Sequence, residues 1–127
     1  MQPIEYNFPD DPEQRSYRIF PPELETDEHV FFHGTAAGNL QSIIEAGFQF
    51  PPPPKAQSVS FASSSALALR YGCSPLNGDI GNGCIIAVRY ADLTRLAAEG
   101  FGVYDYRLDP QPTIVGYCNI PSTYRHA

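Results

Sequence analysis

The alternation of apolar and polar residues along the chain predicts several short strands. The aromatic and β-branched run at 29–33 is typical of a strand, and we expect its carboxyl end to present His33. Residues 58–62 alternate polar and apolar side chains, as a half-buried strand does. The continuous apolar run at 84–90 predicts a strand inside the sheet. Two further strands are expected at 102–107 and 113–120.

Helical spacing of apolar residues occurs in shorter stretches. Leucine, isoleucine and phenylalanine recur between 40 and 48, which predicts an amphipathic helix of about ten residues that ends at Gly47. A second helix is expected at 66–71, after a row of serines suited to capping it. Asp92 can cap a brief third helix that stops at Gly100. Because strands outnumber helices and the helices are short, the pattern predicts an α+β fold.

Prolines and turn-forming residues divide these elements. Residues 1–28 are rich in proline and acidic residues, so we expect an N-terminal arm there, with a short strand at 16–20, and the folded domain at 29–127. The four prolines at 51–54 predict polyproline II or loop. Asparagine, aspartate and glycine at 73–83 predict a second loop.

Composition limits the classes of function. The 127 residues, 43% of them hydrophobic, suit one packed domain, and a net charge of −6 disfavours nucleic acid as a partner. We expect a soluble, cytoplasmic protein without membrane contact, because no apolar run reaches the ~18 residues of a span and the start lacks signal-peptide features. Cys73, Cys84 and Cys118 lack metal-site spacing, so we expect buried free thiols and no metal.

Four residues could together grip a nicotinamide nucleotide. His33 can bond a sugar hydroxyl, and Gly34 has no side chain to keep a flat amide away from its backbone. Thr35 adds a hydroxyl beside them. Tyr71 can offer an aromatic face to the cationic pyridinium ring, an attraction of roughly 0.5–2 kcal/mol. We therefore predict binding of NAD as a co-substrate.

The order of these motifs resembles that of the ADP-ribosyltransferase superfamily, in its poly- and mono-ADP-ribosyltransferase branch with His, Tyr and a variable third residue. The family's HG[TS] motif matches 33–35, and its helix motif N-L-x-x-I-L-x-x-G-[LF] is similar to 39–48. The [YF]-F-A triplet corresponds to 60–62, and Tyr71 follows nine residues later at the family's spacing. The resemblance extends from about Val30 to Tyr90.

The resemblance implies a compact, split β-sheet core of mainly antiparallel strands with short flanking helices. It also implies that His33 bonds the ribose, the Gly34 backbone takes the carboxamide, and Tyr71 stacks on nicotinamide. The donor-binding set would further include Thr35 and the triplet Ser60, Phe61 and Ala62.

The third catalytic residue and two departures from the family pattern are less well defined. The family's late-strand glutamate corresponds best to Glu99, with Asp105 and Gln111 as weaker candidates. Ser60 stands where the family often has a tyrosine, and Ala68 stands where a serine often bonds the carboxamide. Loss of that hydroxyl costs on the order of 1 kcal/mol of binding. The candidates to replace it are Ser64 and Ser65.

The expected reaction is transfer of one ADP-ribose to a macromolecular acceptor, protein rather than nucleic acid, with release of nicotinamide. The compact size also fits a toxin or effector domain. Two alternatives remain open: an NAD glycohydrolase that uses water as the acceptor, and an inactive module that only binds. The transferase and the glycohydrolase would use the same donor site, so the sequence alone does not separate them. The tRNA-repair relatives would need a basic cleft, which this acidic chain disfavours.

Overall fold

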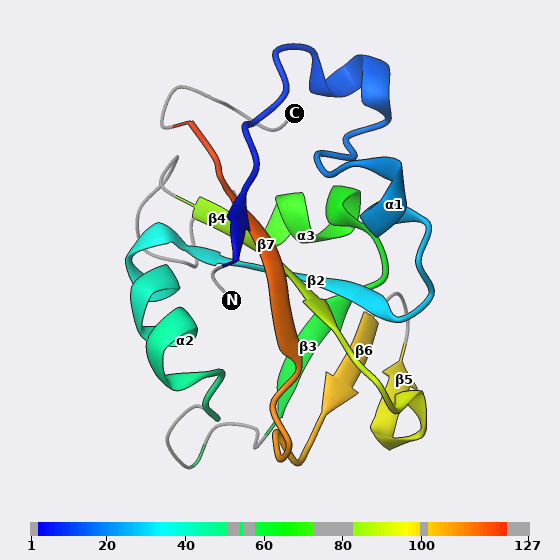
Figure 1. Ribbon diagram of the computed structural model, residues 1–127, viewed down its shortest axis with the longest axis vertical. Helices are drawn as coiled ribbons and strands as arrows, with labels where there is room; N and C mark the ends of the chain where they lie inside the picture. Colours follow the sequence, from blue (N-terminus) through cyan, green and yellow to red (C-terminus); the bar gives the residue numbers. More distant parts are fainter. Residues whose placement is uncertain (1–2, 51–53, 55–57, 73–82, 100–101, 122–127) are drawn as a thin grey trace.

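The computed structural model describes residues 3–50, 54, 58–72, 83–99 and 102–121, with the backbone alone at 70–72 and 99 (Figure 1). The strands are β1 (Ile4–Glu5), β2 (Val30–Ala36), β3 (Val59–Ala62), β4 (Gly83–Arg89), β5 (Leu96–Glu99), β6 (Gly102–Asp105) and β7 (Thr113–Asn119). The helices are α1 (Pro22–Glu25), α2 (Leu40–Ala46) and α3 (Ser65–Gly72). The 3-10 turns are η1 (Pro12–Arg15), η2 (Ala37–Asn39) and η4 (Leu93–Arg95).

The described strands form one seven-stranded sheet in the order β1-β7-β4-β2-β3-β6-β5. Neighbouring strands are antiparallel except β1 and β7, which are parallel. β2 pairs with β4 along its whole length but with β3 only between Phe32 and Ala62. The expected α+β class with mainly antiparallel strands is therefore confirmed. The expected split into a pair of sheets is not observed among the described strands, which form a single sheet with only one residue pair between β2 and β3.

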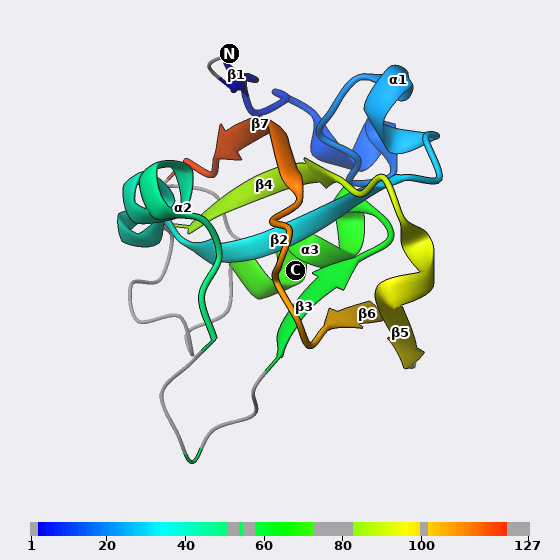
Figure 2. The ribbon, with the colours of Figure 1, turned by 60° about the horizontal axis from the view of Figure 1, so that its bottom comes forward.

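β4 lies inside the sheet, between β7 and β2, and both of its faces are covered. Ile85 and Ala87 belong to a core cluster that α3 and the N-terminal segment complete. Ile86 and Val88 belong to a second cluster, against which side chains of α2 pack. Alternate residues of a strand point to opposite faces, so α2 and α3 cover opposite faces of the sheet (Figure 2). The prediction of an inner strand at 84–90 is confirmed.

The N-terminal segment, expected as an arm, packs on the same core as the rest of the chain. β1 pairs with β7, and Ile19, Phe20 and Leu24 are buried with α3 and β4. The Tyr6 ring lies so close over Gly116 that a Cβ there would be 2.5 Å from the ring. These contacts join the segment to the domain at 29–127.

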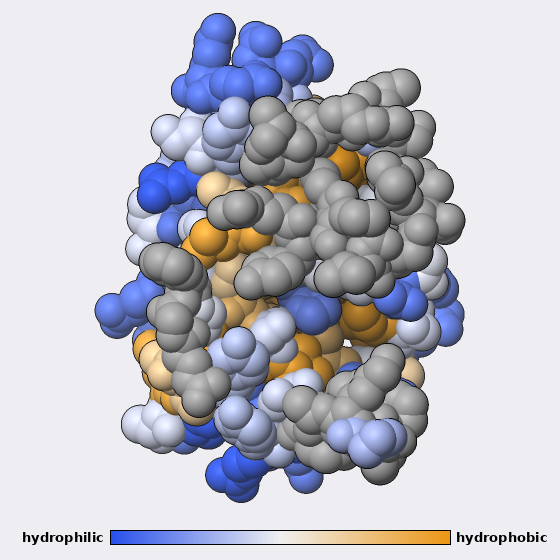
Figure 3. All heavy atoms as spheres, turned by 180° about the vertical axis from the view of Figure 1, so that it is seen from behind, coloured by the Kyte–Doolittle hydropathy of each residue, from blue (hydrophilic) through white to orange (hydrophobic). Residues whose placement is uncertain are grey.

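The short strand expected at 16–20 is absent, and that prediction was wrong. Ser16 and Tyr17 have φ angles of 55° and 62°, in the left-handed region that an extended strand excludes. Pro12 and Pro22 instead begin η1 and α1, because a proline ring presets the φ angle of a first helical turn. The exposed residues around η1 form the hydrophilic upper end of the face in Figure 3.

β2 continues past its expected end, which places His33 in the middle of the strand instead of at its carboxyl terminus. The cause is β4, which pairs with every residue of β2 from Val30 to Ala36. Downstream, α2 ends at Gly47 as predicted, and the φ of Gly47 is 84°.

The third expected helix is replaced by η4 and β5. Asp92 caps the turn as predicted, since its side chain accepts a hydrogen bond from the Thr94 N–H. The chain then pairs with β6 through four residue pairs, from Leu96 to Glu99. Pairing with a neighbouring strand thus overrides the weak helical spacing of this stretch. Of the loop expected at 73–83, residues 73–82 lie outside the described residues, and Gly83 is the first residue of β4.

Candidate functional site

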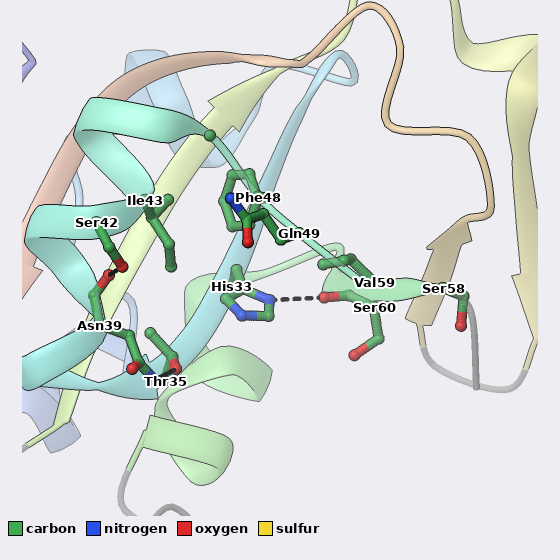
Figure 4. A pocket seen from close by; sticks show the side chains of 11 residues that line it. His33, Thr35, Asn39, Ser42, Ile43, Phe48, Gln49, Ser58, Val59 and Ser60 are labelled. Carbon is green, nitrogen blue, oxygen red and sulfur yellow. Dashed lines mark hydrogen bonds between the residues drawn. The ribbon is translucent and has the colours of Figure 1, made fainter. Parts of the chain in front are cut away.

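A pocket of about 380 Å³ lies between α2, the segment after Gly47, and strands β2 and β3 (Figure 4). Its described lining carries hydroxyl, amide, imidazole and apolar groups and no carboxylate, ammonium or guanidinium group. We call it the His33 pocket. Five of the side chains that line it are His33, Thr35, Asn39, Ser42 and Phe48.

His33 is held where β2 and β3 separate. Its Nδ1 lies 2.8 Å from the Ser60 carbonyl oxygen, and because a carbonyl can only accept, Nδ1 carries the proton and donates. The ring contacts Phe48 and Phe61, with centroid distances of 5.3 and 5.5 Å. This leaves Nε2 with a lone pair and no hydrogen-bond partner among the described residues.

The environment keeps this imidazole neutral. Burial lowers the pKa of His33 below its usual 6.5, because the charged form loses hydration, and the bond to Ser60 only partly opposes this. Near pH 7 the residue therefore offers an acceptor at Nε2 and no charge.

The opposite wall of the pocket is a hydrogen-bonded set at the start of α2. The Asn39 amide donates to Thr35 Oγ1 at 2.9 Å, and the Ser42 hydroxyl donates to the Asn39 carbonyl at 3.1 Å. Thr35 is buried, whereas Asn39 and Ser42 are exposed. Their remaining lone pairs and N–H groups can bond the hydroxyls of a ligand.

Gln111 fixes the Phe48 wall. Its side chain accepts from the Phe48 N–H at 2.9 Å and donates to the Phe48 carbonyl at 2.9 Å and to the Leu108 carbonyl at 3.0 Å. A Cβ at Gly47 would lie 2.8 Å from the Gln111 side chain, so this turn requires glycine. Because the amide is used in this way, the structure gives a structural role to Gln111, and its weaker candidacy as the third catalytic residue remains a prediction.

The pocket brings together only part of the predicted donor site. His33, Thr35 and Ser60 line it. Gly34 is half-buried beside His33 on β2, while Phe61 and Ala62 are buried in the two core clusters. Their predicted contacts with NAD remain predictions.

Tyr71 belongs to α3, which covers the opposite face of the sheet from α2. Its side chain lies outside the described set. The predicted stacking of Tyr71 on nicotinamide therefore remains a prediction.

The serines proposed to replace the family hydroxyl are engaged in structural bonds. The Ser65 hydroxyl is buried, donates to Glu25 and accepts from the Ile19 N–H. Ser64 Oγ accepts from the Leu67 N–H at 3.3 Å. Ala68 itself is fully buried in the core. The Ser65 hydroxyl is therefore used as a donor within the protein, whereas the bond to Leu67 does not use the Ser64 O–H, and the predicted role of Ser64 remains a prediction.

Glu99 ends β5, at the edge of the described sheet. The ladder runs from Phe32 to Ala62, from Ala62 to Gly102, and from Gly102 to Glu99. Three interstrand spacings put the Glu99 backbone about 14 Å from that of Phe32, the neighbour of His33. The Glu99 side chain lies outside the described set, so its catalytic role remains a prediction.

Asp105 is buried in a hydrogen-bonded node. Its Oδ2 accepts from Tyr90 Oη and Arg95 Nη2, both at 2.8 Å, and its Oδ1 accepts from the N–H groups of Arg107 and Leu108. The Arg95 guanidinium also lies 4.9 Å from the Tyr90 ring centre. We call Asp105, Arg95 and Tyr90 the Asp105 node. Burial and these four bonds disfavour Asp105 as the third catalytic residue, a role that remains a prediction.

The node shifts the acidity of its members. Burial alone would raise the pKa of Asp105, but the four donors outweigh it and the pKa lies below its usual value. Burial also raises the pKa of Tyr90, and the neighbouring carboxylate adds to the rise. The aspartate is therefore ionised and the tyrosine protonated near pH 7.

Sequence reasoning missed Asn39, Ser42 and Phe48 as pocket residues. Asn39 and Phe48 begin and end the stretch that resembles the family's helix motif, so that motif was a usable signal. The contact between Phe48 and Gln111 spans 63 residues, and no local pattern marks it.

Cys84 and Cys118 are free, buried thiols, and burial raises their pKa values to about 11 and about 12. Within the described ranges, no three metal-binding side chains come together and no helix has the length and apolarity to cross a membrane. Comparison of the chain with models of known protein families and with curated proteins gives no match.

Proposed function

We propose that this protein has an ADP-ribosyltransferase-like fold and transfers a single ADP-ribose from NAD to a protein, with release of nicotinamide. The observation that carries the proposal is His33, a neutral imidazole anchored through Nδ1, whose Nε2 is unbonded among the described residues and whose described pocket lining is uncharged. The mainly antiparallel α+β sheet and the order of the motifs along the chain support it.

The His33 pocket suits an uncharged nucleoside part of the donor. Its volume of about 380 Å³ exceeds that of a single sugar, and Phe48 offers an apolar wall. Nε2 of His33 would accept a hydrogen bond from a ribose hydroxyl, and Thr35 and Asn39 would bond further hydroxyls. Each such bond contributes about 0.5–1.5 kcal/mol of net binding.

Cleavage of the bond between nicotinamide and ribose passes through an oxocarbenium-like state. The proposal assigns Tyr71 to the departing ring, the Gly34 backbone to the carboxamide, and Glu99 to the ribose. Nicotinamide leaves with the electron pair of the broken bond and is neutral. The acceptor nucleophile bonds to the sugar carbon and loses its proton to a base. Holding these groups in line supplies much of the rate enhancement.

The charge of the chain favours a protein acceptor. At a net charge of −6 the long-range field repels nucleic acid, and the described lining of the pocket adds no basic group. Water as the acceptor would make the protein an NAD glycohydrolase with the same donor site.

A second candidate function, binding of NAD or ADP-ribose without turnover, is favoured by one observation. Two of the three candidates for the third catalytic residue, Asp105 and Gln111, are committed to structural bonds. Turnover would then depend on Glu99 alone. The two candidates differ in whether nicotinamide is released.

The deciding experiment incubates the purified protein with labelled NAD, with and without a cell lysate. We expect released nicotinamide and label on protein, and both should fall at least tenfold in His33→Ala. His29→Ala is the matched control. His29 directly precedes β2, but its ring bonds the Tyr90 carbonyl and does not line the pocket. Free ADP-ribose without labelled protein identifies a glycohydrolase.

Binding of NAD without nicotinamide release identifies the silent module. Full turnover by His33→Ala contradicts the site, and Glu99→Gln tests the third residue. Turnover that survives Glu99→Gln removes Glu99 from the mechanism.

A further inference from the structure

We infer that Glu25, in the N-terminal segment, is a positioning residue for the nicotinamide end of the donor site, because it holds the first turn of the helix that carries Tyr71. The role of Tyr71 rests on the proposed function. The attachment of Glu25 to α3 rests on contacts in the structure.

The contacts join three segments at one point. Glu25 Oε2 accepts from the Ser65 hydroxyl and from the Phe20 N–H, the latter at 3.1 Å, and Oε1 lies 3.5 Å from the Ser65 N–H. Ser65 Oγ in turn accepts from the Ile19 N–H at 3.0 Å. Residues 19–25 are thereby tied to the start of α3, 40 residues further along the chain.

The tie is shielded from water at its Ser65 end, whereas Glu25 is half-buried. Ser65 is 0% exposed, and Ile19 and Phe20 are 2% and 1% exposed. A hydrogen bond to a carboxylate is about twice as strong as one between neutral groups, and a negative charge at a helix N-terminus is favourable. Glu25 supplies both effects to the first residue of α3.

α3 needs such a tie because it is short. An eight-residue helix is not stable alone, so its placement depends on tertiary contacts. Ala68 and Leu69 bury one side of it in the core, and Glu25 and Ser64 bond its first turn. At 1.5 Å per residue, position 71 lies about 9 Å along the axis from Ser65. A small tilt at Ser65 therefore displaces position 71, and a shift of about 1 Å at a reacting group can cost roughly a hundredfold in rate.

The His33 pocket gives an internal reference. It lies with α2 on the other face of the sheet, and neither Glu25 nor Ser65 lines it. Loosening α3 should therefore affect nicotinamide and leave the part of the donor bound beside His33 in place. A general loss of structure would weaken both.

The test compares Glu25→Gln with Glu23→Gln in the full chain. Glu23 is the exposed glutamate of the same short helix, so its variant controls for the lost charge. Three quantities are measured: the inhibition constant of nicotinamide, the dissociation constant of ADP-ribose, and hydrogen exchange of the α3 amides. We expect nicotinamide inhibition to weaken about tenfold in Glu25→Gln, with ADP-ribose binding changed less than twofold and α3 exchange faster. Glu23→Gln should match the wild type.

Equal weakening of both ligands, or no change in nicotinamide inhibition with unchanged exchange, would overturn the inference. If Glu25→Gln does not fold, Ser65→Ala, which removes the two bonds of the Ser65 hydroxyl and keeps the charge of Glu25, is measured in the same way. A wild-type protein that releases no nicotinamide would defeat the proposed function. The exchange measurement would still decide whether Glu25 holds α3, so the two failures are distinguishable.

Discussion

The His33 pocket and the Asp105 node lie on strands of the same sheet but use their polar groups in opposite ways. In the pocket, His33 is bonded at Nδ1 and leaves Nε2 unbonded among the described residues. In the node, the Asp105 carboxylate accepts four hydrogen bonds, about as many as its two oxygens can take.

The difference separates a site able to bind from one that holds the fold. The Asp105–Arg95 pair joins the start of β5 to the end of β6, and Tyr90 ties both to the end of β4. Among the described residues, the buried Nε of Arg95 has no hydrogen-bond partner. Perturbed acidity alone would have favoured Asp105 as the functional residue. Unused hydrogen-bonding capacity next to a cavity favours His33.

The largest expected effect comes from breaking the node. Asp105→Ala should lower the free energy of unfolding by about 3–5 kcal/mol, because it leaves the Arg95 charge buried without its partner. Denaturant unfolding measures this, with the exposed Asp10→Ala as control. A loss below about 1 kcal/mol, the range of a surface ion pair, would mean that water reaches the Asp105–Arg95 pair in solution.

A smaller effect should follow when the wall of the pocket is released. Gln111→Ala removes three bonds to backbone groups, two of them on the buried Phe48. We expect a loss of about 1–2 kcal/mol of stability and an increase in the KM for NAD. Gln14→Ala, at an exposed position in η1, is the control. Lost stability with an unchanged KM would show that Phe48 does not touch the donor.

Within the pocket, Asn39→Ala should affect binding more than folding. The variant removes the donor to Thr35 Oγ1 from an exposed residue, so we expect a three- to tenfold higher KM for NAD, about 0.7–1.4 kcal/mol, and nearly unchanged stability. The exposed Asn7→Ala serves as control, with KM and unfolding measured on both. An unchanged KM would place the donor away from this wall.

The smallest expected effect on the fold is the pH response of His33. Its pKa in the folded protein is lower than 6.5, whereas the unfolded chain has the usual value of about 6.5. Below about pH 6.5 the unfolded state binds more protons, so stability falls as the pH drops from about 6.5 toward the folded pKa, and it does not change with the titration of His33 above about pH 6.5. NAD binding should persist at pH 6.5 and decline only when Nε2 is protonated.

NMR titration of the His33 ring, with unfolding measured at several pH values, tests this response. The sequence has three histidines, so the signal that is missing from the spectrum of His33→Ala assigns the His33 ring by difference. A His33 that titrates above 6.5 would contradict the neutral acceptor on which the donor site depends.

Local patterns located most elements and one wall of the site. The run at 84–90, the terminator Gly47 and the cap Asp92 were each recognisable, because period, positive φ and capping depend on neighbours in the chain. His33 was recognisable for a similar reason, since it stands in an ordered motif.

Contacts between distant residues decided the rest. The pairing of β5 with β6, the Gln111 side chain against Phe48, and the Glu25 tie to Ser65 join parts of the chain whose own patterns do not announce them. The role of Asp105 was also decided by distant contacts. Its carboxylate suggested catalysis, but in the fold it is buried and accepts four hydrogen bonds. Chain-local preferences are worth a few tenths of a kcal/mol per residue, whereas burial and pairing contribute several kcal/mol at a site. For that reason the strand order, the pocket wall and the carboxylates left for chemistry were settled by the tertiary structure.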